Sequence, residues 1–304
     1  MLRVLMPDSA LPLSTLPLSA SPPLAAPWPE ARERRVRLMG IVNVTPDSFS
    51  DGGKFDALEA ALAHARQLEA EGADILDIGG ESTRPGAAEV SAADEMARVL
   101  PVIAALAQKT PSQENPSQEN PARVISIDTY KAAVARAACK AGASLINDVW
   151  GLQRDPAIAD VAAEFGAGVV IMHNRTEKDE TLDITEDLAA FFTRSLALAE
   201  KAGVARARIA LDPGIGFGKT PEQNLAAIRA IPHLKAMFGC AILLGVSRKS
   251  FLGLITGRSV GERLPATLAA DSFGLLAGAD VLRVHDVAAH RDAALVLAAL
   301  ATHR

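Results

Sequence analysis

Hydrogen-bonding residues recur at the ends of short apolar segments of the chain, and their types indicate a binding pocket for a polar ligand. Asp128 ends the segment VISID, Asn147 lies near the end of SLIND, and Asp212 ends RIALD. Two carboxylates and an amide in a buried pocket would suit a flat heterocycle with several N–H groups, such as a pterin or a guanine. A strand-end Asp can also cap the next helix, and Asp77 and Asp148 stay open between the two roles.

Cationic residues lie at the ends of two further apolar segments. Lys249 comes shortly after ILLGV, and Arg283 and His285 belong to VLRVHD. Arg283 and His285 occupy alternate positions of an extended segment, so their side chains share one face. Such groups suit a phosphate or pyrophosphate group. The sequence therefore predicts a site that is polar at its base and cationic at its mouth.

The segment LDPGIGFGKT (211–220) is similar to nucleotide-binding motifs but fails each of them at one position. Pro213 stands where a Walker loop needs glycine, and Lys219 stands where a dinucleotide fingerprint needs glycine. The segment is better interpreted as a Gly-rich turn that lets the backbone approach a ligand. No Cys/His spacing predicts a zinc site.

Eight apolar segments rich in Ile, Val and Leu predict parallel strands buried on both faces. They are Val36–Val44, Asp74–Ile78, Arg123–Asp128, Ser144–Val149, Gly168–Met172, Arg208–Leu211, Ala241–Gly245 and Asp280–Val284. A helical pattern follows each strand, at 56–72, 92–108, 131–141, 156–165, 186–202, 222–237, 263–277 and 288–301, with Asp56 as the expected cap of the first. These units predict an α/β protein, a (β/α)8 TIM barrel in one domain over 36–304. A doubly wound open sheet is the alternative, usually with fewer strands.

All eight units place polar groups after the strand, on the face that carries the active site in such barrels. Asn43 follows LMGIV and His173 follows VVIM, whereas Met172 is expected to be pocket wall. The helical patterns place His64, His233 and His290 at the surface.

Composition bounds the function classes. The 304 residues carry 31 Lys and Arg against 36 Asp and Glu, a net charge of −5, with 49% hydrophobic residues. This charge argues against a nucleic-acid partner, and no apolar run is long enough for a membrane helix. Cys139 and Cys240 are too few for a disulfide framework and predict a reducing, cytoplasmic location.

Two segments lie outside the barrel pattern. Residues 1–35 hold seven of the 18 prolines and predict a flexible or loosely docked extension. A signal peptide is the less favoured alternative, because Asp8 and the prolines interrupt its apolar region. The repeated PSQENPSQENP (111–121) predicts a surface-loop insertion.

Seven motifs from residue 39 onward closely resemble those of the dihydropteroate synthase family. They are MGIVNVTPDSFSDGG (39–53), DIGGESTRPGA (77–87), SIDTYK (126–131), INDVWG (146–151), LDPGIGFGKT (211–220), GVSRKSFLG (245–253) and RVHDV (283–287). The resemblance implies a homodimeric barrel that joins dihydropterin hydroxymethyl pyrophosphate to p-aminobenzoate, with Mg²⁺ as cofactor and sulfonamides as inhibitors.

The resemblance also implies roles for individual residues. It assigns the catalytic roles to Asp128, Lys249, Arg283 and His285. The implied substrate contacts are these four with Thr83, Arg84, Asn147, Met172, Asp212, Phe217, Gly245 and Ser250. Asn43 is the implied metal ligand. Thr83 and Arg84 would belong to a loop that closes over p-aminobenzoate, with Phe217, Lys249 and Ser250 in the same subsite.

Two other functions are weighed against this one. A methyltetrahydrofolate corrinoid methyltransferase domain is also a pterin-binding barrel, but it has no leaving pyrophosphate that would need the cations of SRK and RVH. A catalytically silent homologue should have lost a loop or cation residue, and Asn43, Lys249 and Arg283 are all present. The sequence therefore favours the synthase.

Overall fold

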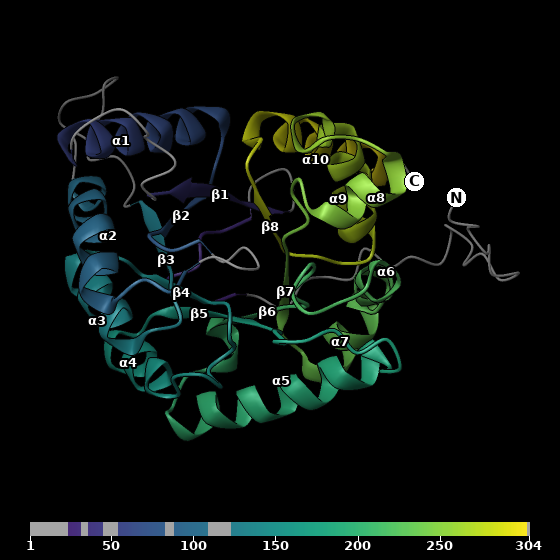
Figure 1. The fold of residues 1–304 in the computed structure, drawn as a ribbon, viewed down its shortest axis with the longest axis horizontal. Helices are drawn as coiled ribbons and strands as arrows, with labels where there is room; N and C mark the ends of the chain where they lie inside the picture. Colours follow the sequence, from purple (N-terminus) through teal and green to yellow (C-terminus); the bar gives the residue numbers. More distant parts are fainter. Residues whose placement is uncertain (1–23, 32–35, 45–53, 83–87, 109–122, 303–304) are drawn as a thin grey trace, which may run out of the picture.

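The computed structural model describes residues 24–31, 36–44, 54–82, 88–108 and 123–302. Eight parallel strands form a closed barrel in the order of the chain (Figure 1). The strands are β1 (Arg37–Asn43), β2 (Ile75–Gly79), β3 (Val124–Asp128), β4 (Leu145–Asp148), β5 (Gly168–Met172), β6 (Ile209–Asp212), β7 (Ala241–Leu244) and β8 (Val281–Val284). The predicted TIM barrel is confirmed, because β8 pairs with β1 and leaves no open edge.

Helices surround the barrel. They are α1 (Lys54–Glu71), α2 (Ala92–Ala107), α3 (Ala132–Ala141), α4 (Ala157–Phe165), α5 (Ile184–Lys201), α6 (Pro221–Arg229), α7 (Ile231–Phe238), α8 (Ser250–Thr256), α9 (Leu264–Leu276) and α10 (Val287–Thr302). Among the described residues, no helix combines the length and apolarity needed to cross a membrane.

Three details of the helices differ from the sequence prediction. Helix α1 begins at Lys54, so Asp56 lies within its first turn instead of capping it. The single helix predicted over 222–237 is two helices that meet at Ala230, because Pro232 has no N–H to continue α6. Helix α8, directly after Lys249, was not predicted. The repeat at 111–121 lies outside the described residues.

The register of the strands brings the predicted polar residues to one rim. Asp128 is paired with Gly79 of β2 on one side and with Asn147 of β4 on the other. On the next strands, Met172 is paired with Asp212. Because all strands run in one direction, their carboxyl ends meet at the same end of the barrel.

Residues 24–31 close the opposite end of the barrel. Trp28 is 5% exposed and packs among apolar side chains that point into the barrel, including Met39, Leu145 and Val170. Its indole N–H donates to the carbonyl oxygen of Arg208 at 2.9 Å. A Cβ atom on Gly168, the first residue of β5, would lie 2.5 Å from the indole nitrogen. This part of the predicted extension is therefore packed into the barrel floor, while the boundary drawn at residue 36 stays a prediction.

We predict that Trp28→Ala lowers the free energy of unfolding by about 3–5 kcal/mol, since a large buried side chain is replaced by a cavity. Urea denaturation measures this change. Phe165→Ala is the control, because Phe165 is 37% exposed and its loss should cost less than about 1.5 kcal/mol. Equal losses in the two variants would show that Trp28 is not part of the core.

Candidate active site

Arg283 of β8 holds two carboxylates, one on β2 and one on β3. Its Nε donates to Oδ2 of Asp77 at 2.6 Å, and a terminal nitrogen donates to Oδ2 of Asp128 at 2.7 Å. Asp77 is fully buried and Asp128 nearly so. The Oδ1 atom of each carboxylate is also buried, and the described protein atoms give it no hydrogen-bond partner. These two oxygens are therefore the free acceptors of the site.

Asn147 and Asn43 complete this side of the site. The Asn147 amide donates to Oδ2 of Asp77 at 3.0 Å, so Asp77 joins β2, β4 and β8. Gly79 leaves room between the neighbouring groups, because a Cβ atom there would lie 3.7 Å from Oδ2 of Asp128 and 3.8 Å from Oδ1 of Asn43. Asn43 thus lies on the same part of the rim as Asp128.

Asp212 and Lys249 form the other side, around a segment that we call the β6 turn (residues 213–219). Oδ1 of Asp212 accepts from the backbone N–H of Gly214 at 2.7 Å. The Lys249 ammonium donates to the Ile215 carbonyl and lies 4.7 Å from the centre of the Phe217 ring. At one end the turn donates a hydrogen bond to Asp212, which is predicted to bind the pterin. At the other end it carries Phe217, which is predicted to contact p-aminobenzoate.

Gly245 keeps the two sides of the site open to each other. A Cβ atom at this position would lie 3.7 Å from Cβ of Arg283 and 4.0 Å from Oδ2 of Asp212. Met172 is buried beside Asp212 on β5, as expected of a wall residue. Ser250 begins α8 directly after Lys249.

His285 lies beside a hydroxyl group at the edge of the site. The distance between His285 Nδ1 and Ser247 Oγ is 2.9 Å. Arg248 adopts a φ of 57° and forms a two-point ion pair with Asp286, which fixes the segment between Ser247 and Lys249. The hydroxyl, the imidazole and Arg283 could together bind an anion.

Burial shifts the pKa values of the charged groups. It raises the pKa of the Asp128 carboxyl to about 7, although the Arg283 guanidinium opposes the rise. It lowers the pKa of the Lys249 ammonium to about 8, although Asp212 opposes the fall, and it raises the pKa of Asp212. The carboxylates raise the pKa of Arg283, so this residue stays charged. The site therefore contains groups that can change charge near neutral pH.

Most of the predicted site residues are brought together. Thr83 and Arg84 lie outside the described residues. Asp77 belongs to the site, whereas Asp148 braces the turn after β4 by accepting from the N–H groups of Trp150 and Leu152. The surface prediction for His290 is wrong, because its ring is buried and lies 3.0 Å from Asp271.

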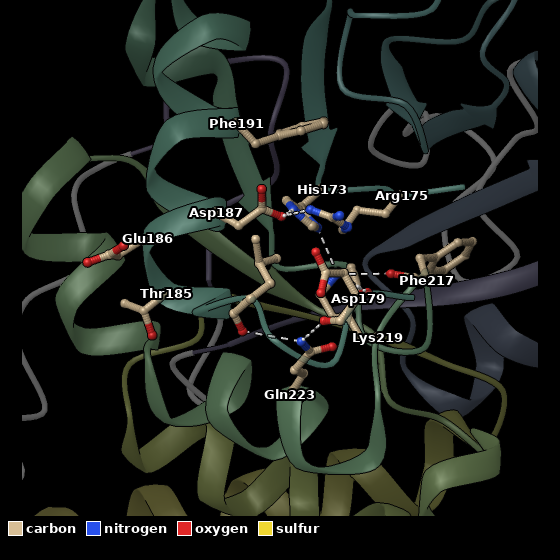
Figure 2. Close-up of polar contacts among 12 residues, drawn as sticks. His173, Arg175, Asp179, Thr185, Glu186, Asp187, Phe191, Phe217, Lys219 and Gln223 are labelled. Carbon is tan, nitrogen blue, oxygen red and sulfur yellow. Dashed lines mark hydrogen bonds and ion pairs between the residues drawn. The ribbon is translucent and has the colours of Figure 1, made fainter. Parts of the chain in front are cut away.

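Sequence reasoning missed a buried polar network next to the β6 turn (Figure 2). Lys219 is 2% exposed, and its ammonium lies 2.7 Å from Nδ1 of His173. His173 in turn lies 2.8 Å from Asp187 of α5. A cavity of about 600 Å³ adjoins this network and is lined by Trp150, Arg175 and Asp187, among others. The only warning in the sequence was a lysine within the Gly-rich turn.

The donor set for a metal ion is sparse. Across the described ranges, no group of three or more His, Cys, Asp or Glu could hold a metal ion. Mg²⁺ commonly takes one or two protein oxygens and completes its shell with water and substrate phosphates. The amide oxygen of Asn43 therefore fits a Mg²⁺ ion that arrives with a pyrophosphate group, and does not fit an ion held by the protein alone.

Comparison with known proteins agrees with this fold. Residues 39–285 match the family described as pterin binding enzyme. The dihydropteroate synthase of Bacillus subtilis is 46% identical over 84% of this chain and 85% of its own. Xanthomonas albilineans dihydropteroate synthase, solved with 4-aminobenzoic acid, superposes with a TM-score of 0.81 at 42% identity, covering 90% of this chain and 95% of its own. The Yersinia pestis enzyme, solved with a sulfonamide drug, superposes with a TM-score of 0.80 at 37% identity, covering 92% of this chain and 99% of its own.

The chain therefore belongs to the pterin-binding enzyme family. Within that family it is a transferase with the activity of a dihydropteroate synthase.

We predict that Arg283→Met lowers the free energy of unfolding by about 3–5 kcal/mol at pH 7, because two buried carboxylates lose their cation. Urea denaturation again measures the change. Arg258→Met is the matched control, since Arg258 and Glu262 form an exposed pair whose loss should cost at most about 1 kcal/mol. A variant as stable as the wild type would show that Arg283 does not stabilise the buried Asp77 and Asp128.

Proposed function

We propose that this chain joins dihydropterin hydroxymethyl pyrophosphate to p-aminobenzoate with the residues described above. The observation that carries the assignment is the Arg283 bridge, which fixes Asp77 and Asp128 while leaving one buried oxygen of each free for a ligand. Free carboxylate oxygens beside the Asn147 amide suit the N–H groups of a pterin. Asp212 and Lys249 would bind the other side of the ring.

The pyrophosphate end would lie over Arg283 and His285. Both offer N–H donors, and Ser247 adds a hydroxyl group. Mg²⁺ with Asn43 as its protein ligand would supply positive charge that stabilises the leaving pyrophosphate. The bond between the methylene carbon and the pyrophosphate oxygen breaks, and its electron pair leaves with the pyrophosphate. Arg283 and His285 stabilise the growing negative charge.

The electron-poor methylene carbon left by this cleavage needs a nearby negative charge. Asp128, when ionised, would supply it from the base of the pocket. The amine of p-aminobenzoate then forms the new C–N bond with its lone pair and releases a proton to solvent. Phe217, Lys249 and Ser250 would form the second-substrate subsite, with Thr83 and Arg84 as further predicted contacts. Because the Yersinia pestis relative was solved with a sulfonamide drug, we propose that sulfonamides compete at this subsite.

We predict that the wild-type protein makes dihydropteroate and pyrophosphate from the two substrates and Mg²⁺, and that kcat falls at least about a hundredfold in Asp128→Asn. Chromatography of the pterin product measures both. Asp160→Asn is the control, because Asp160 is exposed on α4 and should leave the rate unchanged. Turnover of Asp128→Asn near the wild-type rate would count against the mechanism.

The same assay has an expected pH dependence. The pKa of Asp128 is about 7, so its carboxyl is neutral below that pH and charged above it. The wild-type kcat/KM for the pterin substrate should therefore fall as the pH drops through about 7. The residual activity of Asp128→Asn should lack this fall at low pH.

We also propose a cytoplasmic homodimer formed through the face of α8, α9 and α10, since α9 packs against the other two (Figure 1). Large apolar side chains are exposed on these helices and on the segment between α8 and α9, namely Leu254, Val260, Phe273, Val296 and Leu300. Such a patch usually marks an interface.

We predict that the double variant Leu254→Glu and Val296→Glu sediments as a monomer while the wild type sediments as a dimer. Met237→Glu on α7 changes a half-exposed apolar residue away from this face and should remain dimeric. A wild-type monomer, or a dimeric double variant, would refute this interface.

A further inference from the structure

Lys219 is the last residue of the β6 turn, and its buried ammonium lies against the backbone of the turn (Figure 2). Its ammonium donates to the Gly214 carbonyl at 2.8 Å and to the Phe217 carbonyl at 3.2 Å. The third contact is Nδ1 of His173 at 2.7 Å. An ammonium group has three donors, and these contacts use all of them. The turn is thus folded around the ammonium.

The contacts fix the protonation pattern of the neighbouring histidine. Burial lowers the pKa of Lys219 to about 7, although Asp212 opposes the fall. In its ammonium form Lys219 can only donate, so Nδ1 of His173 accepts and its Nε2–H donates to Asp187. His173 is fully buried, and burial lowers its pKa to about 4, so the neutral form that this pattern needs is the stable one. Arg175 donates to the same Asp187 oxygen at 2.9 Å. Asp187 therefore fixes the His173 ring so that its Nδ1 accepts a hydrogen bond from Lys219.

The glycines of the turn allow the close approach that these contacts require. Gly214 has a φ of 63°, and a Cβ atom there would lie 1.8 Å from the His173 carbonyl oxygen. Gly218 has a φ of 55°, and a Cβ atom there would lie 2.5 Å from Cβ of Arg175. The backbone of the β6 turn is therefore pressed against the residues that follow β5. Any movement of the turn has to break the contacts of Lys219.

The turn carries groups that face the active site. Lys219 binds the carbonyls on either side of Ile215, whose own carbonyl accepts from Lys249. The Phe217 ring lies 4.7 Å from the Lys249 ammonium. The position of Lys219 therefore sets where Phe217 and Lys249 meet. Asp128 and Asn147 belong to β3 and β4, so their positions do not depend on this turn.

The partners of Lys219 are unusual for a lysine that only stabilises a fold. No carboxylate contacts its ammonium among the residues described here, and a buried charge without a paired charge is costly. Lys235, by contrast, is a buried lysine that pairs with Asp280 at the start of β8, away from the site. A Met side chain would fill the space of Lys219 at lower desolvation cost.

We propose that Lys219 is a positioning residue for the second substrate: held by His173 and Asp187, it shapes the β6 turn that presents Phe217 and Lys249 to p-aminobenzoate. This inference rests on the proposed placement of p-aminobenzoate against Phe217. Loss of the ammonium frees the Gly214 and Phe217 carbonyls and lets the ring leave Lys249. Recognition of the pterin by Asp128 and Asn147 is retained.

The test compares Lys219→Met with the wild type in the dihydropteroate assay. We expect the KM for p-aminobenzoate to rise at least about tenfold, the effect of losing a charged hydrogen-bonding group. The Kd of the dihydropterin pyrophosphate, measured by calorimetry, should rise less than about threefold, because Asp128 and Asn147 keep their contacts and only Asp212 and Lys249 touch the turn. Lys235→Met is the matched control and should lose thermal stability without changing either constant. An unchanged KM, or equal changes in both constants, overturns the role of Lys219.

A second pair of variants decides the question if Lys219→Met does not fold. His173→Asn keeps an oxygen acceptor near the position of Nδ1, whereas His173→Leu has none. We expect His173→Leu to raise the KM for p-aminobenzoate and His173→Asn to restore most of the loss. Equal KM values in the two variants overturn the proposal. A wild-type protein that forms no dihydropteroate refutes the proposed function itself, which separates that failure from a failure of this inference.

Discussion

The site depends on the ion-pair bridge that Arg283 makes between Asp77 and Asp128. The three residues belong to β8, β2 and β3, and β1 lies between the first two strands. Only a closed barrel brings the end of β8 within reach of carboxylates that are 206 and 155 positions away in the chain. The guanidinium pairs with both carboxylates and still leaves one oxygen of each free. Closure of the sheet therefore also assembles the proposed pterin pocket.

Such a site is costly for the folded state, because buried carboxylates with unused oxygens lose hydration without full compensation. The opposite end of the barrel offsets this cost. The interior at that end is apolar and includes Met39 and Val281. Trp28, which precedes β1 in the chain, packs among these side chains. Stability and binding are thus separated along the barrel axis, with packing at the floor and charged groups at the rim.

The strands and the rim residues could be predicted because they follow from local pattern. Apolar runs mark β1 to β8, and Asp128, Asn147 and Asp212 end three of them. The errors arose where a distant contact decides. His290 has a surface-like helical spacing, but Asp271 of another helix gives its buried ring a partner. The role of Asp77 could not be settled until Arg283 was placed beside it.

Lys219 shows that a distant contact can also decide the role of a residue within a recognised motif. Glycines at 214, 216 and 218 predict a tight turn near a ligand, and all three have positive φ. They do not predict what the turn closes around, because His173 follows β5 and Asp187 belongs to α5, both far from the motif in the chain. From the sequence alone, Lys219 has no role beyond its place in a Gly-rich turn. Its burial and its three acceptors direct the charge inward instead, so the residue acts on the substrate through Phe217 and Lys249.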